Sequence, residues 1–351
     1  MGEAMNEAVN TDIFSVMTVP AESVAPETAI GVARAHWGIT ATATLLTGER
    51  DRNFRLRADD GAQYVLKFAN PAEDPGVTDL QVQALLHVAA YDPGFPVPRM
   101  VPSLAGALEE RTQDGHRVRL LSWLHGIPLH EARRSRTQRG NLGRELARLG
   151  LALRDFRHPS SRHELIWDLA HTLRLREVIG VITDAPTRRV LEAALDAFAR
   201  EVQPVLGSLR RQVLYNDMNT GNTLIDAADH DRLGGIIDFG DLVETAVVID
   251  AAVGATPQVA PDMGVTEAIA AFIGGFHAVR PLLAEEVALL PTLIAARFSM
   301  GLILQVWHRT THPDNPHYRI VSVEEMARRC EIIAAAGSPA TLAAVRTVCA
   351  T

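Results

Sequence analysis

Three short polar side chains stand at the ends of two apolar runs between residues 213 and 240. Asp217 and Asn222 are five positions apart in a polar loop, and Asp238 follows the next apolar run. Carboxylate and carboxamide oxygens are good ligands for Mg²⁺, and a carboxylate can also accept the proton of an attacking hydroxyl. This spacing predicts a phosphoryl-transfer site. Asp217 would orient or deprotonate the acceptor hydroxyl, while Asn222 and Asp238 would hold Mg²⁺ on nucleotide phosphates.

The spacing carries more information than any one of these residues. Asp-Phe-Gly at residues 238–240 is a weak motif by itself, because glycine often follows an aromatic residue in turns. An alternative interpretation is that the polar residues only end two edge strands through Asn, Asp and Gly turns. The order Asp, Asn five residues later, and Asp-Phe-Gly after a hairpin-length spacer favours the chemical interpretation.

Further upstream, Lys67 stands alone in the apolar run of residues 63–69. A lysine in such a strand is ordinarily a solvated residue at an exposed edge. Because the three polar residues described above occur in the same chain, we instead expect Lys67 to bind the α- and β-phosphates of the nucleotide. The polar loop of residues 47–54 precedes this strand and could cover the phosphates with its backbone N–H groups.

The elements that would position these residues fall into two parts. Strand-like runs at residues 41–46, 55–57 and 63–69 predict an antiparallel sheet, and residues 59–61 carry a hairpin signal between the last two runs. A helix is expected after the sheet, over residues 78–91. Beyond residue 129, apolar residues recur mainly at helical spacing. We therefore expect an α+β, bilobal fold with a flexible leader over 1–25, an N-lobe of β-sheet plus helix over 26–124, and a helical C-lobe over 125–351.

The boundary between the predicted lobes has a possible binding role of its own. A strand over residues 118–124 runs into a Gly/Pro-containing linker. Backbone N–H and C=O groups around Ser122 and Leu124 could face the edge of a purine base. A plain interdomain connector is compatible with the same residues.

In the predicted C-lobe, leucines at helical spacing indicate a helix over 141–157 with Asn141 as its N-cap. Another helix is expected over 186–206. A third contains residues 247–252 and a buried-looking carboxylate, Asp250. We expect Asp250 to bond the backbone of the catalytic loop rather than to contact substrate.

Composition narrows the class of protein. The chain has 351 residues, 47% of them hydrophobic, and a formal net charge of −8, so nothing indicates a nucleic-acid partner. Cys330 and Cys349 show neither metal-ligand spacing nor a disulfide framework, which favours the reducing cytoplasm. Arg297 and Gln305 interrupt the apolar stretch 287–307, so we expect a buried helix and no membrane span. No feature of the sequence indicates an oligomeric state.

With these residues in place, the chain resembles the aminoglycoside phosphotransferase/choline kinase superfamily, and within it the hydroxylysine kinase-like group. The resemblance covers about residues 30 to 330. It rests on Glu-Arg-Asp-Arg-Asn-Phe, Val-Leu-Lys, Trp-Leu-His-Gly-Ile-Pro-Leu, Trp-Asp-Leu, Asn-Asp-Met through Asn, and Ile-Asp-Phe-Gly-Asp, at residues 49–54, 65–67, 123–129, 167–169, 216–222 and 237–241.

The resemblance implies a protein-kinase-like fold, with ATP or GTP as co-substrate and Mg²⁺ in the cleft between the lobes. It assigns Arg50 and Asn53 to a phosphate-covering loop. Gln81 stands where such kinases carry the glutamate that pairs with the strand lysine, so Gln81 could hold Lys67 by a hydrogen bond, though not by charge. A surface glutamine is the alternative interpretation. The family usually has His and Gly before the catalytic Asp, where this chain has Tyr215 and Asn216. Tyrosine can also pack under the loop and donate a hydrogen bond.

The resemblance suggests phosphorylation of a hydroxy-amino acid, with 5-hydroxy-L-lysine as the best candidate. Homoserine, an aminoglycoside or an amino alcohol are alternative acceptors, and a catalytically weak nucleotide-binding pseudokinase is a second alternative. Trp167 and Asp168 either line the acceptor pocket or cap and staple a helix. The full set of candidate acceptor residues is Trp167, Asp168, Asp241, Arg297 and Trp307.

Overall fold

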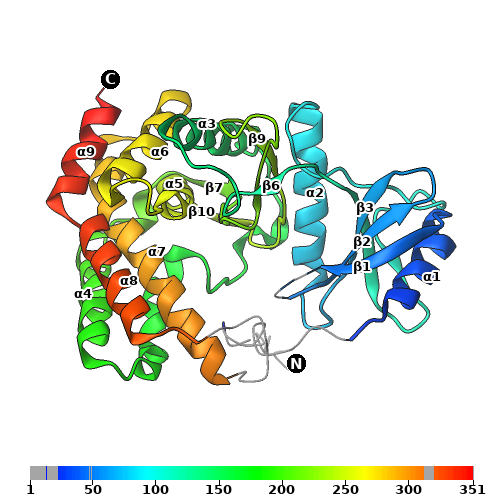
Figure 1. Cartoon of the computed structure of the whole chain (residues 1–351), viewed down its shortest axis with the longest axis horizontal. Coiled ribbons are helices and arrows are strands. Elements are labelled where there is room, and N and C mark those ends of the chain that lie inside the picture. The colour runs from blue at the N-terminus through cyan, green and yellow to red at the C-terminus, as the bar shows by residue number, and fades with distance from the viewer. Residues whose placement is uncertain (1–12, 14–22, 47, 49, 312–319, 351) are drawn as a thin grey trace, which may run out of the picture.

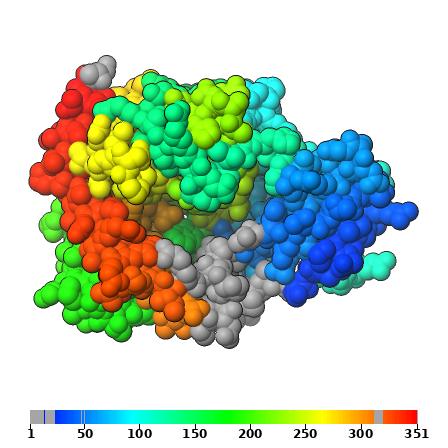
Figure 2. Space-filling model, viewed as in Figure 1, coloured from blue at the N-terminus to red at the C-terminus, as the bar shows by residue number. Residues whose placement is uncertain are grey.

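The computed structural model describes residues 13, 23–46, 48, 50–311 and 320–350. Most of the expected leader, as well as Thr47 and Glu49 of the expected phosphate-covering loop, lie outside the described residues. Two lobes lie side by side, a smaller β-rich one and a larger helical one (Figure 1). In the space-filling view the smaller lobe forms the blue mass at one end of the molecule (Figure 2). This arrangement confirms the predicted α+β, bilobal, protein-kinase-like fold.

The smaller lobe is built on a five-stranded antiparallel sheet in the order β1-β2-β3-β5-β4. Its elements are α1 (Pro26–Trp37), β1 (Ala41–Leu46), β2 (Arg52–Ala58), β3 (Gln63–Phe68), α2 (Pro75–Tyr91), β4 (Glu110–Arg111) and β5 (Arg117–Ser122). One face of the sheet packs with α1 into an apolar core that contains Phe54, Leu56, Leu66 and Phe68. In the sheet register, Lys67 pairs with Asn53 of β2 and with Arg119 of β5.

Helix α2 connects the two lobes by packing. Asp74 caps its N-terminus by accepting a hydrogen bond from the backbone of Gly76. The apolar side of the helix, which includes Leu80 and Val88, belongs to the core of the larger lobe. Figure 1 accordingly shows α2 standing between the sheet and the helical lobe. The face of α2 that carries Gln81 and Val82 lines the cleft.

The larger lobe surrounds two small sheets with helices. Its strands are β6 (Ile127–Pro128), β7 (Arg211–Leu214), β8 (Thr223–Ile225), β9 (Leu233–Ile236) and β10 (Val243–Ala246). Its α-helices are α3 (Arg136–Ala152), α4 (Ala185–Glu201), α5 (Val247–Ala255), α6 (Val265–Val279), α7 (Ala284–Thr311), α8 (Val323–Ala336) and α9 (Pro339–Cys349). The pairings β10-β7 and β6-β8-β9 fix the loops that carry the predicted catalytic residues.

Helix α3 begins earlier than the sequence predicted. Ser135 is its N-cap and accepts a hydrogen bond of 2.9 Å from the backbone of Gln138, so the assignment of Asn141 as N-cap is wrong. The first turn is polar and therefore gave no apolar signal. Arg139 is nevertheless fully buried, because it bonds Asp262 and the Gln258 carbonyl. Asn141 lies inside the helix and donates 2.8 Å to the Asp231 carbonyl.

Helix α7 is long and apolar enough to span a membrane by length and composition, with a mean hydropathy of 1.9 in its most apolar window. However, 78% of that window is buried inside the fold, which is the pattern of a core helix. The predicted buried helix over 287–307 is therefore confirmed. The polar residues that interrupt it, Arg297 and Gln305, face the cleft between the lobes.

Candidate active site

The loop between β7 and β8 carries the predicted catalytic residue, and two buried groups hold this loop in place. Asp250 of α5 accepts a 2.9 Å hydrogen bond from the backbone N–H of Asn216, as predicted. Tyr215 is fully buried, packs edge-on against Phe239 and donates 2.5 Å to the carbonyl of Ile237. Tyr215 thus connects the loop that carries Asp217 to the strand end that carries Asp238.

Two non-glycine residues at this site have left-handed backbone conformations. The φ angles are +60° at Asn216 and +57° at Asp238. Asparagine and aspartate tolerate this conformation better than other side chains, but it is still sparsely populated. Asn216 directly precedes Asp217, the predicted catalytic residue, and Asp238 is itself a predicted metal ligand. The strain therefore falls where side chains must be aimed out of regular strands and into the cleft.

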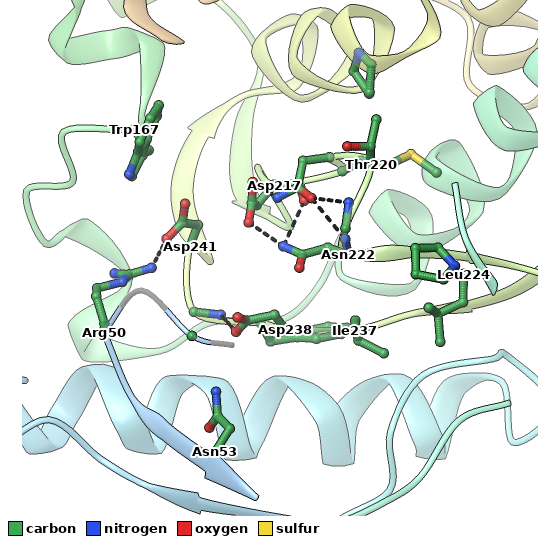
Figure 3. Close-up of a pocket in the computed structure, with 18 of the residues that line it drawn as sticks. Arg50, Asn53, Trp167, Asp217, Thr220, Asn222, Leu224, Ile237, Asp238 and Asp241 are labelled. Atoms are coloured by element: carbon green, nitrogen blue, oxygen red, sulfur yellow. Dashed lines mark hydrogen bonds and ion pairs between the residues drawn. The ribbon is translucent and has the colours of Figure 1, made fainter. Parts of the chain in front are cut away.

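The carboxylate of Asp217 is held by two amides from its own loop. Asn219 Nδ2 donates to Oδ1 at 2.9 Å, and Asn222 Nδ2 donates to Oδ2 at 2.5 Å. Burial, with the negative charge of Asp241 nearby, raises the pKa of Asp217 well above its ordinary value, and the charge of Arg297 opposes this shift. Figure 3 shows the side chain of Asn222 between Asp217 and Asp238.

Asp238 lies opposite Lys67 across the cleft. Lys67 Nζ is 3.3 Å from Asp238 Oδ1, and the lysine charge lowers the pKa of that carboxyl. The Asp238 side chain is 46% exposed into the cleft, whereas that of Lys67 is only 12% exposed. Lys67, Asp217, Asn222 and Asp238 therefore line one cavity, although they come from three separate stretches of chain.

The expected contact between Gln81 and Lys67 is not formed. Lys67 Nζ instead lies 3.3 Å from Asp51 Oδ2, and the same oxygen lies 3.5 Å from Nη2 of Arg119. Gln81 accepts a 3.1 Å hydrogen bond from Arg119 Nη1. The reason is the sheet register. Arg119 is the cross-strand neighbour of Lys67, and its guanidinium group makes the hydrogen bond to the side-chain amide of Gln81 on α2.

The loop before β2 is folded back against the sheet. The backbone N–H of Asn70 donates 3.2 Å to Asp51 Oδ1, and its side chain donates 3.2 Å to the Arg50 carbonyl. Gly48 is needed for this close approach, because a Cβ there would lie 2.7 Å from the Asp51 carbonyl oxygen and 2.9 Å from Asn53 Nδ2. The loop therefore places Asp51 beside Lys67 and Arg50 toward the other lobe.

Arg50 and Asp241 form an ion pair between the lobes. Arg50 comes from the smaller lobe and Asp241 from the loop after Asp238, and Figure 3 shows the pair on one side of Asp217 and Asn222. Asp241 is only 5% exposed. Trp167 lies on the same side of the site in Figure 3, with Arg297 of α7 over its ring at 4.9 Å from the centroid.

These residues surround a cavity of about 1310 Å³ between the lobes. The predicted nucleotide residues that line it are Arg50, Asn53, Lys67, Gln81, Ser122 and Leu124. At the rim, Ser122 exchanges two hydrogen bonds with the backbone of Arg99, through its own N–H and its hydroxyl. This exchange anchors the strand end before Leu124. Apolar side chains that line the same cavity could pack on both faces of a flat ring. They are Leu46, Val65, Met100, Leu121 and Ile237.

Two predicted acceptor residues lie elsewhere. Asp168 is 2% exposed and caps the 3₁₀ helix η3 (Leu169–Glu177), where it also accepts 2.8 Å from Thr245 Oγ1. Trp307 is 8% exposed and packs in the core of the larger lobe, with its ring centroid 4.8 Å from that of His308. The expectation that these two side chains line the acceptor pocket is therefore not met. Trp167, Asp241 and Arg297 do line the cavity between the lobes.

The cavity also contains polar residues that the sequence interpretation missed. Among them are Glu73 before α2, Gln305 on α7, and Glu325, Arg328 and Arg329 on α8. Burial raises the pKa of the Glu73 carboxyl. A polar residue interrupting an apolar helix was the available signal for Gln305.

A magnesium ion at this site would need oxygen ligands from the protein. Among the described residues, no three His, Cys, Asp or Glu side chains come together in a metal-binding cluster. Mg²⁺ does not require one, since it is usually held by one or two protein oxygens, the nucleotide phosphates and water. The exposed carboxylate of Asp238 and the amide oxygen of Asn222 are such a pair, so the residues fit the ion.

Comparisons with known proteins agree with this geometry. The sequence model described as "Phosphotransferase enzyme family" matches residues 42–291. Hydroxylysine kinase of Mus musculus is 26% identical over 305 residues, which cover 80% of this chain and 81% of that protein. Homoserine kinase of Methylobacillus flagellatus is 28% identical over 312 residues, covering 83% of this chain and 89% of that protein.

Among solved structures, a microcompartment-associated aminopropanol kinase superposes with a TM-score of 0.67 at 20% identity. The superposition covers 90% of this chain and 96% of that one, and at this identity it demonstrates a shared fold. The family model covers well over half of the present chain, from the first strand to helix α7. The chain therefore belongs to the phosphotransferase enzyme family, as the motifs predicted.

Proposed function

We propose that this protein transfers the γ-phosphoryl group of ATP or GTP to the hydroxyl of a hydroxy-amino acid, with 5-hydroxy-L-lysine as the best candidate. The observation that carries the proposal is the convergence of Lys67, Asp217, Asn222 and Asp238 on one cavity. The similarity to curated hydroxylysine kinases over four fifths of the chain supports the choice of acceptor.

In this mechanism the nucleotide lies between the lobes, with its base near Ser122 and Leu124 and its phosphates near Lys67. Phosphoryl transfer needs positioning and charge neutralisation more than covalent help from the protein. Lys67 binds the α- and β-phosphates, and Asp51 keeps its ammonium group aimed at them. Mg²⁺, held by Asn222 and Asp238, would neutralise the charge that develops on the phosphate oxygens.

Asp217 acts on the acceptor. Its carboxylate lies at the centre of the site, so an acceptor hydroxyl bonded to it faces the γ-phosphate. As the hydroxyl oxygen attacks phosphorus, the bond to the β–γ bridging oxygen breaks and the hydroxyl proton passes to Asp217. The amides of Asn219 and Asn222 hold the carboxylate in one orientation before substrate binds.

Purified protein incubated with Mg-ATP or Mg-GTP and 5-hydroxy-L-lysine tests the proposal. We expect nucleotide consumption that depends on the amino acid, and a phosphate ester on its hydroxyl detected by ³¹P NMR. Turnover of a different alcohol, with none of hydroxylysine, would reject this acceptor. No turnover of any hydroxyl compound would favour a nucleotide-binding pseudokinase.

A second candidate acceptor is homoserine. It is favoured by the 28% identity to a homoserine kinase, which extends over 83% of the present chain. Both amino acids carry a hydroxyl on a short chain that ends in an α-amino acid group. Relative kcat/KM for hydroxylysine and homoserine, measured in one assay, separates the two candidates.

A further inference from the structure

Two helix faces form the part of the cavity farthest in sequence from the nucleotide-binding strands. Helix α7 contributes Arg297, Gly301 and Gln305, which are spaced i, i+4 and i+8 and therefore share one face. Helix α8 contributes Glu325, Arg328, Arg329 and Ile332, spaced i, i+3, i+4 and i+7. Figure 2 shows the orange-red surface of α8 on the larger lobe.

These faces carry a positive excess, since three arginines meet one carboxylate. Arg329 Nη2 lies 2.6 Å from Glu325 Oε1, and its Nη1 donates 2.9 Å to Gln305 Oε1. This pairing ties α8 to α7 and compensates one charge. Arg297 stacks over the ring of Trp167, and its positive charge acts to lower the pKa of Asp217. Arg328 is exposed on the cavity wall and makes no hydrogen bond or ion pair within the part of the chain that the structure describes.

The opposite charge lies nearer the reacting atoms. Asp217 lies at the centre of the site, and Asp241 lies on the side of it toward Trp167 (Figure 3). An acceptor that spans this part of the cavity therefore meets carboxylates close to the γ-phosphate position and guanidinium groups beyond them. This polarity suits a zwitterion. It does not suit a polycation such as an aminoglycoside, whose distal amino groups would face Arg297 and Arg328.

We propose that the α7 and α8 faces bind the carboxylate of the acceptor, with Arg328 and Arg297 as the charged contacts. A guanidinium group offers paired N–H donors that match the two oxygens of a carboxylate. Arg329 positions this end by joining α8 to Gln305. The inference rests on the proposed function, and it narrows the acceptor to hydroxy compounds that carry a carboxylate.

The test compares acceptors that differ only in the carboxylate. 5-Hydroxy-L-lysine is paired with 1,5-diaminopentan-2-ol, and homoserine with 3-aminopropan-1-ol. The wild type should prefer the carboxylate form of each pair by at least about tenfold in kcat/KM, since charged hydrogen bonds are worth about one to two powers of ten. Arg328→Gln should raise KM for the amino acid about tenfold and erase most of that preference. It should leave KM for the nucleotide unchanged.

Arg346→Gln is the matched control, because it removes the same charge from an exposed position on α9 outside the cavity. Equal rates for both members of a pair, or an Arg328→Gln variant with an unchanged amino-acid KM, would overturn the inference while leaving the kinase function intact. A raised nucleotide KM would show that the arginine serves phosphate instead. If no acceptor turns over, calorimetric binding of 5-hydroxy-L-lysine with a non-hydrolysable nucleotide decides. Arg328→Gln must then weaken that binding relative to Arg346→Gln, and no difference would overturn the inference.

Discussion

Asp51 Oδ2 lies 3.3 Å from Lys67 Nζ, in the role that the sequence had assigned to Gln81 of helix α2. Lys67, the lysine that we propose binds phosphate, is thus oriented by the loop that precedes β2 and not by the helix that follows β3. Because Asn70 and Gly48 fix that loop against the sheet, the position of Lys67 depends on the loop conformation.

Replacing Asp51 should therefore weaken nucleotide binding. Asp51→Asn keeps the shape of the side chain but removes the shared counter-charge of Lys67 and Arg119. We expect KM for the nucleotide to rise about tenfold, because a charge-assisted hydrogen bond contributes roughly 1.5–3 kcal/mol. Gln81→Ala, which loses only the bond to Arg119, should change this KM by less than about threefold. Steady-state kinetics with saturating acceptor measures both, and the reverse order of effects would refute Asp51 as the positioning residue.

Asp238 should decide the metal dependence of the reaction. In the structure its carboxylate neutralises Lys67, and it is exposed toward the cavity where phosphates would lie. Asp238→Ala should abolish metal-dependent turnover at every Mg²⁺ concentration tested, while thermal unfolding stays within a few degrees of the wild type. Chelation with EDTA should stop the wild type reversibly. Full activity in the variant would refute the metal assignment.

The hydroxyl of Tyr215 should contribute to stability and to the alignment of the two loops. Tyr215→Phe keeps the ring packed on Phe239 but leaves the buried carbonyl of Ile237 without its 2.5 Å donor. We expect a loss of about 1–2 kcal/mol in the free energy of unfolding. Tyr91→Phe is the control, because Tyr91 is 62% exposed and should change stability by less than about 0.5 kcal/mol. Urea denaturation distinguishes the two, and equal effects would contradict a structural role for the hydroxyl.

Asp250 makes stability depend on pH. Burial raises its pKa from 3.8 to about 7, against the opposing influences of the Asn216 hydrogen bond and Arg280. Between these two values the folded state keeps the proton that the unfolded state has lost, so this contribution falls as pH rises. Asp250→Asn still accepts the bond from Asn216 and has no proton to lose.

The stability of the Asn variant relative to the wild type should therefore rise from about pH 4 to about pH 7 and then level off. The total change is on the order of 4 kcal/mol, at about 1.4 kcal/mol per pKa unit. Denaturation midpoints at closely spaced pH values give this difference directly. A difference that is flat across the window would mean that Asp250 is ionised throughout.

The sequence predicted well what depends on local spacing. The five-residue interval from Asp217 to Asn222, the lone lysine of β3 and the buried Asp250 each lead to the observed neighbours. Local spacing could not predict whether Gln81 or Asp51 contacts Lys67, because that choice depends on the register between strands. The arginines of α8 carry no motif. Only the packing of α8 on α7 brings Arg328 and Arg329 to the cavity.

The proposed function depends on Asp217, which we propose accepts the proton of an amino-acid hydroxyl during phosphoryl transfer in this cavity. The most direct measurement is the rate of formation of phosphorylated 5-hydroxy-L-lysine by the wild type and by Asp217→Asn, under saturating Mg-nucleotide. We expect product from the wild type and a loss of about 10²–10⁴-fold in kcat for the variant, with nucleotide affinity and unfolding temperature little changed. Equal kcat values for the two proteins, or no phosphorylated amino acid from the wild type, would contradict it.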